Sequence, residues 1–159
     1  MWYQFAYIYA NNTASNKNYV NYSSIVRCVN GRSDSYYILD LQSGKVCYPS
    51  VNISMNKCQY YSGIGCWPYS DSNNVICSLT YSSFSDNIAN GDRCIWLNTY
   101  YAKYEIKSRN ILRNTQVSSS YGTIYTSGNL MIEDSCILEN TATNIFYQGL
   151  SSYTITLSN

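Results

Sequence analysis

The sequence contains no histidine. This absence excludes Ser-His-Asp and Cys-His nucleophilic sites, histidine metal sites and the commonest general base. None of the cysteines forms a C-x-x-C pair, so the spacing for zinc or thiol redox chemistry is missing. A glycine-rich phosphate loop is also missing. The sequence therefore predicts no catalytic, cofactor-binding or metal-binding residue, and a protein that is not an enzyme.

Charge is also scarce. Ten Lys and Arg residues balance nine Asp and Glu residues to a net charge of +1, so no global field attracts nucleic acid or an anionic surface. No run of 18 apolar residues could form a transmembrane helix. The apolar start MWYQFAYIYA lacks a basic region before it and a cleavage site after it, so it does not resemble a signal peptide. We expect no nucleic-acid partner and no membrane span in this chain.

Cysteine is present in an odd number, so a complete set of disulfides within one chain is impossible. In a reducing compartment these residues would be small buried apolar side chains, and paired disulfides are the alternative. The cysteines stand at positions 28, 47, 58, 66, 77, 94 and 136.

Proline occurs only twice and glycine eight times, whereas tyrosine occurs nineteen times. Together with abundant Ser, Thr and Asn, this composition is typical of a β-rich protein. A length of 159 residues suits one domain, residues 1–159, with its own core.

What the sequence does have is a loose internal repeat, found by aligning the chain on one asparagine per segment. With one exception, the residues eight and three places before that asparagine are apolar or Tyr. The exception is Arg27, where a one-residue shift would restore an inward apolar side chain. The aligned asparagines are Asn11, Asn30, Asn56, Asn87, Asn114 and Asn140; the residues eight places earlier are Tyr3, Tyr22, Tyr48, Leu79, Ile106 and Ile132; those three places earlier are Ile8, Arg27, Ile53, Phe84, Ile111 and Ile137.

Short β-branched runs that recur at this interval predict an all-β fold, a single right-handed parallel β-helix (solenoid) of about six turns. In such a fold the asparagines can stack at a bend, their side-chain amides bonding from turn to turn. The alternative is that Asn is simply favoured in bends with left-handed backbone. The predicted structural ladder comprises Asn30, Asn56, Asn87, Asn114 and Asn140.

The segments SSFSDNIAN and RNILRNTQVSSSYGTIYTSGNLMIEDSCILENTATNIFY carry a resemblance to a known family. They resemble the parallel β-helix repeats of polymorphic outer membrane protein type, and still more closely uncharacterised surface-protein-like paralogues of parasitic protists. The resemblance covers Leu79 to Ser158, with YGTI where the bacterial repeats have a GGAI-type corner, and the stretch Ser62 to Val75 resembles an enlarged loop. It implies an adhesive or surface-display role, at a cell surface or secreted, without an assigned activity.

Three charged residues directly precede ladder asparagines: Asp86, Arg113 and Glu139. Stacked one above another they would form an outward ion ladder. Since parallel β-helices that cleave acidic polysaccharides use such groups, a polysaccharide-active enzyme is an alternative function. An arginine between two carboxylates, however, holds both ionised instead of raising either pKa.

Aromatic residues concentrate between the ladder positions, where they could bind sugar rings or a protein partner. The alternative is that they lie in the core or stack on one another only to stabilise the sheet. The aromatic residues in these segments are Tyr36, Tyr37, Tyr60, Tyr61, Trp67, Tyr69, Trp96, Tyr100, Tyr101 and Tyr104. From them we select Tyr60, Tyr61, Trp67, Tyr100 and Tyr101 as a binding surface for a glycan or host protein.

The terminal segments Tyr3–Ala10 and Thr154–Ser158 read as solenoid turns without a cap. Uncapped strand edges pair readily with other chains, so end-to-end self-association is expected. A structural fragment without independent function is the remaining alternative.

Overall fold

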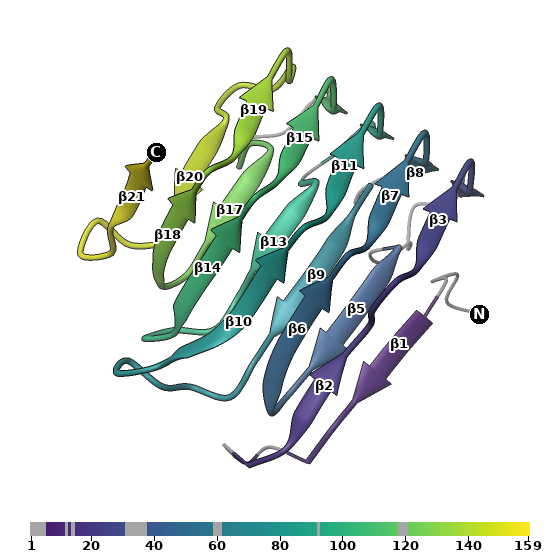
Figure 1. The fold of residues 1–159 in the computed structure, drawn as a ribbon. Coiled ribbons are helices and arrows are strands. Elements are labelled where there is room, and N and C mark those ends of the chain that lie inside the picture. The colour runs from purple at the N-terminus through teal and green to yellow at the C-terminus, as the bar shows by residue number, and fades with distance from the viewer. Residues whose placement is uncertain are drawn as a thin grey trace.

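Parallel β-strands make up all the regular secondary structure of the computed structural model, which describes residues 6–11, 13, 15–30, 38–58, 62–91, 93–117 and 121–159. The chain winds through four parallel sheets, here called A to D, so that strands of successive turns lie side by side and the first and last described strands, β1 and β21, lie at opposite ends of the stack (Figure 1). The prediction of an all-β parallel solenoid is confirmed. There are about five turns, followed by the A and B strands of a sixth, close to the six turns expected.

Sheets A and B contain six described strands each. Sheet A consists of β1 (Ala6–Tyr9), β5 (Leu39–Gln42), β9 (Ile64–Trp67), β13 (Ile95–Leu97), β17 (Ile124–Thr126) and β20 (Phe146–Gln148). Sheet B consists of β2 (Lys17–Tyr19), β6 (Lys45–Pro49), β10 (Val75–Thr80), β14 (Lys103–Lys107), β18 (Asn129–Glu133) and β21 (Ile155–Ser158).

Sheets C and D are shorter. Sheet C consists of β3 (Ser24–Val26), β7 (Asn52–Ser54), β11 (Ser83–Ser85), β15 (Asn110–Leu112) and β19 (Cys136–Leu138). Sheet D consists of β4 (Val29–Asn30), β8 (Lys57–Cys58), β12 (Ile88–Ala89) and β16 (Thr115–Gln116), and Thr141 adds a single bridge to Thr115.

The core is built from inward columns in which one apolar residue lies directly over another. In sheet C, Phe84 pairs in register with Ile53 and Ile111, and all three are fully buried. Each such side chain contributes roughly 1.5–3 kcal/mol through burial. Of the residues eight places before the aligned asparagines, Tyr48, Leu79, Ile106 and Ile132 form such a column in sheet B. Tyr22 is exposed and lies outside the strands, and Tyr3 lies outside the described residues.

The predicted register is wrong in the first turns. Ile25 pairs with Ile53, so Cys28 occupies the ladder position and Asn30 lies two residues beyond it, opposite Cys58 on sheet D. Ile8 pairs with Leu41 in sheet A, which places Asn11 after a strand of a different sheet. The physical reason is that an inward apolar side chain sets the register, and Ile25 fills that position where Arg27 could not.

The stretch Ser62 to Val75 is also more regular than predicted. It contains β9 and the first residue of β10, so the enlarged loop shrinks to residues 68–74. A disulfide joins Cys66 to Cys77, linking an inward position of sheet A to one of sheet B. The five other cysteines are free, and burial raises the pKa of Cys58 and of Cys94 to about 12, so both thiols stay protonated at neutral pH.

Two bends in each turn place non-glycine residues in the left-handed backbone region. At the bend between sheets C and D, Asp86 has a φ of 56° and Arg113 a φ of 51°. This conformation costs an L-residue about 1–2 kcal/mol. It also directs each backbone N–H to the next turn, as where Asp86 N–H donates to Leu112 O at 3.0 Å.

Candidate functional site

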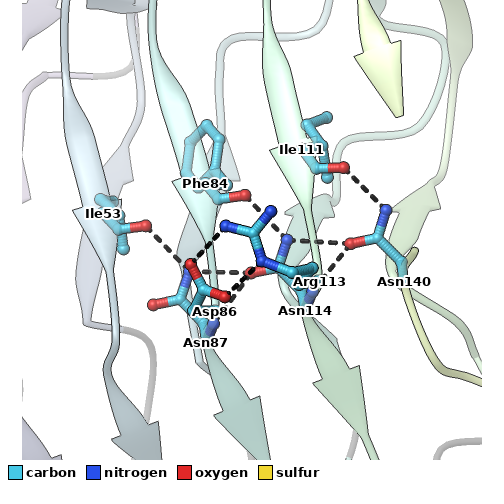
Figure 2. A network of polar contacts seen from close by, with 8 residues as sticks. All are labelled: Ile53, Phe84, Asp86, Asn87, Ile111, Arg113, Asn114 and Asn140. Carbon is cyan, nitrogen blue, oxygen red and sulfur yellow. Dashed lines mark hydrogen bonds and ion pairs between the residues drawn. The ribbon is translucent and has the colours of Figure 1, made fainter. Parts of the chain in front are cut away.

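A buried asparagine ladder runs along the bend between sheets C and D (Figure 2). The Nδ2 atom of Asn114 donates to Phe84 O at 2.8 Å and to the Oδ1 atom of Asn140 at 3.0 Å. In turn, the Oδ1 atom of Asn114 accepts from the Nδ2 atom and the backbone N–H of Asn87, at 2.9 and 3.2 Å. Each amide therefore satisfies backbone groups of two turns at a place where no strand ladder can do so.

The ladder begins at Asn56. The backbone N–H of Cys28 donates to the Oδ1 atom of Asn56 at 2.9 Å, and Asn56 bonds onward to Asn87 through its own amide at 2.9 Å. Four of the predicted ladder asparagines thus form a continuous structural column, whereas the backbone of Asn30 pairs with Cys58 in sheet D, two residues past the ladder position. Such a column stabilises the bend and carries no chemistry of its own.

The predicted charge stack lies on the outer side of the same bend. The Nε and Nη2 atoms of Arg113 donate to the two carboxylate oxygens of Asp86 at 2.7 and 2.9 Å (Figure 2). These bonds lower the pKa of Asp86 below its ordinary value, so the carboxyl is ionised at neutral pH. Both side chains are largely exposed, at 50% and 39%. The pair resembles a solvated surface ion pair more closely than an acid poised to give up a proton.

We expect Arg113→Ala to return the pKa of Asp86 toward its ordinary value of 3.8. Because the folded-state pKa of Asp86 is depressed, the pair stabilises the fold above that pH and loses its effect as the pH falls through the folded-state pKa. Carboxyl NMR titration of both proteins measures the shift. An unchanged titration of Asp86 would show that its environment and not Arg113 sets the pKa.

A row of aromatic rings lies on the outer face of sheet A. It consists of Trp67 on β9, Trp96 on β13, Tyr125 on β17 and Tyr147 on β20, and all four are half-buried. We call these four residues the aromatic row. The ring centroids of Trp67 and Trp96 lie 4.9 Å apart, those of Trp96 and Tyr125 6.1 Å, and those of Tyr125 and Tyr147 5.6 Å. Neighbouring strands thus carry a continuous band of ring surface.

Arg93 anchors the middle of this row. Its guanidinium carbon lies 3.9 Å from the ring centre of Tyr121, 4.1 Å from that of Trp96 and 4.6 Å from that of Tyr125. The residue is only 5% exposed, so these cation–π contacts lie largely out of water, where they are strongest. They fix the rings of Trp96 and Tyr125 in place. Tyr121 also packs edge-on against Tyr125 and Tyr147, and the four rings of the row remain partly exposed.

The five residues predicted to bind a ligand are only partly brought together. Tyr60 and Tyr61 lie outside the described residues. Trp67 belongs to the aromatic row, whereas Tyr100 and Tyr101 occupy the turn between β13 and β14, with exposures of 55% and 68%.

This turn abuts the segment that follows Trp67. Thr99 Oγ1 donates to Pro68 O at 2.9 Å, and Ser70 Oγ donates to Tyr100 O at 2.9 Å. Tyr100 and Tyr101 therefore lie at one edge of sheet A, at the margin of the row.

Sequence reasoning missed Tyr125, Tyr147 and Arg93. Tyr125 pairs with Trp96 and Tyr147 pairs with Tyr125 in the strand register. The sequence pattern that could have identified the two tyrosines is an aromatic residue at the centre of each three-residue strand: IWL, IYT and FYQ.

The described part of the chain contains no group of three or more Cys, Asp or Glu side chains placed to hold a metal ion. It also contains no helix long and apolar enough to cross a membrane. Comparison with protein-family models, with curated proteins and with solved structures found no match to this chain.

Proposed function

We propose that this chain is a non-catalytic β-solenoid binding module with an adhesion-like role, and that the aromatic row is its contact surface for glycans. The observation that supports the proposal is the row itself, four partly exposed rings on four successive strands of one sheet. Aromatic rings bind the apolar faces of sugars, and the strand spacing of about 4.8 Å places successive rings at intervals comparable to a sugar unit. A repeated ligand such as an oligosaccharide suits a repeated surface.

Two further features support a non-catalytic role outside the cytoplasm. Arg113 keeps Asp86 ionised, which leaves this carboxyl unsuited to protonate a leaving group at neutral pH. The Cys66–Cys77 disulfide is typical of an oxidising compartment, in agreement with the surface location that the resemblance implies. A polysaccharide-active enzyme at the Asp86 and Arg113 stack is therefore the less favoured alternative.

Trp96→Ala tests the proposal. We expect glycan array screening to find an oligosaccharide ligand for the unmodified chain, and Trp96→Ala to weaken its binding about tenfold or more, equivalent to ~1.4 kcal/mol. The reason is that Trp96 contacts both Trp67 and Tyr125, so its removal opens a gap in the middle of the row. Isothermal titration calorimetry of both proteins measures the loss.

Tyr81→Ala is the matched control, because Tyr81 is 71% exposed but lies at the bend between β10 and β11, away from sheet A. It should bind the ligand like the unmodified chain. If the chain binds a protein partner and no glycan, the ligand class in the proposal is wrong. If the Trp96→Ala and unmodified proteins bind the ligand equally well, the aromatic row is not the binding site.

A further inference from the structure

The sequence contains three triplets of the form Asn-x-Ser/Thr, which begin at Asn11, Asn21 and Asn52. In a protein that passes through the secretory pathway, this triplet is the acceptor for an N-linked glycan. Such triplets arise by chance in a chain rich in Asn and Ser, so the triplet alone does not identify an acceptor. The structural setting of each asparagine decides between them.

Asn21 lies on the outside of the solenoid, between β2 and β3. The side chains before it alternate, because Asn18 is 3% exposed, Tyr19 is 57% exposed, and Val20 packs against the core. The Val20 N–H donates to Cys47 O at 3.1 Å, so the extended pairing with β6 continues past the end of β2. The same alternation directs Asn21 outward, on the side of Tyr19, and Asn21 is exposed.

The bend that follows opens the triplet to solvent. Tyr22 has a left-handed φ of 46° and is 84% exposed. The corresponding bend two turns later holds Tyr81, which has a turn on either side and is still 71% exposed, so the exposure comes from the shape of the bend. Ser23 Oγ donates to Asn21 O at 2.9 Å, which holds the hydroxyl group of the triplet against its asparagine.

Asn52 has a different setting. It lies on β7 within sheet C, half-buried between Ser24 of β3 and Ser83 of β11. Its Nδ2 atom, which would carry the glycan, donates to Ser24 Oγ at 3.2 Å. A glycan on this atom would crowd both neighbouring strands. Asn11 is exposed, but the middle residue of its triplet lies outside the described residues.

Tyr19 gives Asn21 a feature that Asn52 lacks, an aromatic ring beside the acceptor. Residues two apart in an extended strand lie on one face, about 6.6 Å from each other, so a sugar on the Nδ2 atom of Asn21 comes within reach of the Tyr19 ring. Aromatic rings bind the apolar faces of sugars. The residue two places before Asn52 is Ser50, which offers no ring.

We propose that Asn21 is the acceptor of an N-linked glycan, selected by its bend, and that the Tyr19 ring packs against the first N-acetylglucosamine. The amide nitrogen of Asn21 forms a bond to C1 of an oligosaccharide carried on a lipid pyrophosphate. The bond from C1 to the phosphate oxygen breaks, the lipid pyrophosphate leaves, and the amide nitrogen loses one proton. This inference rests on the location outside the cytoplasm that accompanies the proposed function, but not on the aromatic row.

Peptide mapping tests the acceptor. The full chain is secreted from cultured eukaryotic cells behind a cleavable signal peptide and digested with trypsin, which places Asn21 in peptide 18–27 and Asn52 in peptide 46–57. An amidase that converts a glycosylated Asn to Asp should convert most of peptide 18–27 and little of peptide 46–57. An unmodified peptide 18–27, or equal conversion of the two peptides, overturns the proposal. Neither peptide contains a residue of the aromatic row, so this test and the Trp96→Ala test fail separately.

A thermal comparison tests the ring. After the glycans are trimmed to one N-acetylglucosamine, the chain should have a Tm about 2–4 °C above that of Asn21→Gln, because the sugar covers the Tyr19 ring. In a Tyr19→Ala background the difference should vanish. Tyr81→Ala is the matched control, because Tyr81 is a similarly exposed tyrosine at the corresponding bend, and it should keep the full difference. A difference that survives Tyr19→Ala, or one that is absent from the parent chain, shows that the ring does not hold the sugar.

Discussion

Replacing Asn114 by alanine is expected to lower the free energy of unfolding by about 3–5 kcal/mol, since each buried polar group left without a partner costs about 1–3 kcal/mol. Asn114 is fully buried, and its amide bonds to Phe84, Asn87 and Asn140. The substitution leaves the carbonyl of Phe84 and the donors of Asn87 without partners, in a bend that water does not reach. Urea denaturation followed by circular dichroism measures the loss.

Asn110→Ala is the control for this prediction. Asn110 belongs to the same turn but is exposed on the outer face of β15, so its loss should cost less than about 0.5 kcal/mol. If Asn114→Ala were as mild as Asn110→Ala, the ladder would be an incidental consequence of asparagines in bends, the alternative considered from the sequence.

The periodic core was predictable because inward positions tolerate only apolar side chains. Phe84, Ile111 and Ile137 recur three residues before an asparagine, and the structure stacks them in that register. In the first turn, alignment on the asparagine gave the wrong register. Asparagine is common in this chain, and Asn30 lies near enough to the ladder to be chosen, although Arg27 at the inward position signalled a misfit that a two-residue shift to Ile25 resolves.

The aromatic row was harder to predict because its spacing along the chain is irregular. Trp96 and Tyr125 are 29 residues apart, and Tyr125 and Tyr147 are 22 apart, by subtraction of their positions. The difference arises in the segments that connect the strands, whose lengths vary without disturbing the strands themselves. Register within sheet A is set by pairing between turns, and that information is absent from any one segment.

The burial of Arg109 could not be predicted from the sequence. Its neighbours in the same column, Val51, Ser82 and Ser135, are small, and a long cation at that point would ordinarily be expected to face water. Instead Arg109 is 2% exposed, with its Nη2 atom donating to Tyr48 O at 2.9 Å. Its Nε and Nη1 atoms are buried without a partner. Burial lowers the pKa of Arg109 to about 9.

We therefore expect Arg109→Met to stabilise the fold at pH 7, by about 1–4 kcal/mol, because replacing a buried charge by an apolar side chain of similar length removes a desolvation cost. Tyr48 O does not lose its last partner, since Ser82 Oγ also donates to it at 3.1 Å. Arg109→Lys, which keeps the charge, should bring no such gain. Chemical denaturation of the unmodified protein and the two variants at pH 7 measures the order of their stabilities.

The pH dependence of this gain has a definite sign. Below pH 9 Arg109 is protonated in both folded and unfolded chains, so its burial cost is present in full. As the pH rises above about 9, the folded chain releases the proton while the unfolded chain, with an ordinary pKa of 12.5, keeps it. The unmodified protein then gains stability relative to Arg109→Met, and the difference between the two narrows. A difference that stays constant from pH 7 to pH 11 would mean that Arg109 retains its proton in the folded state over this whole range.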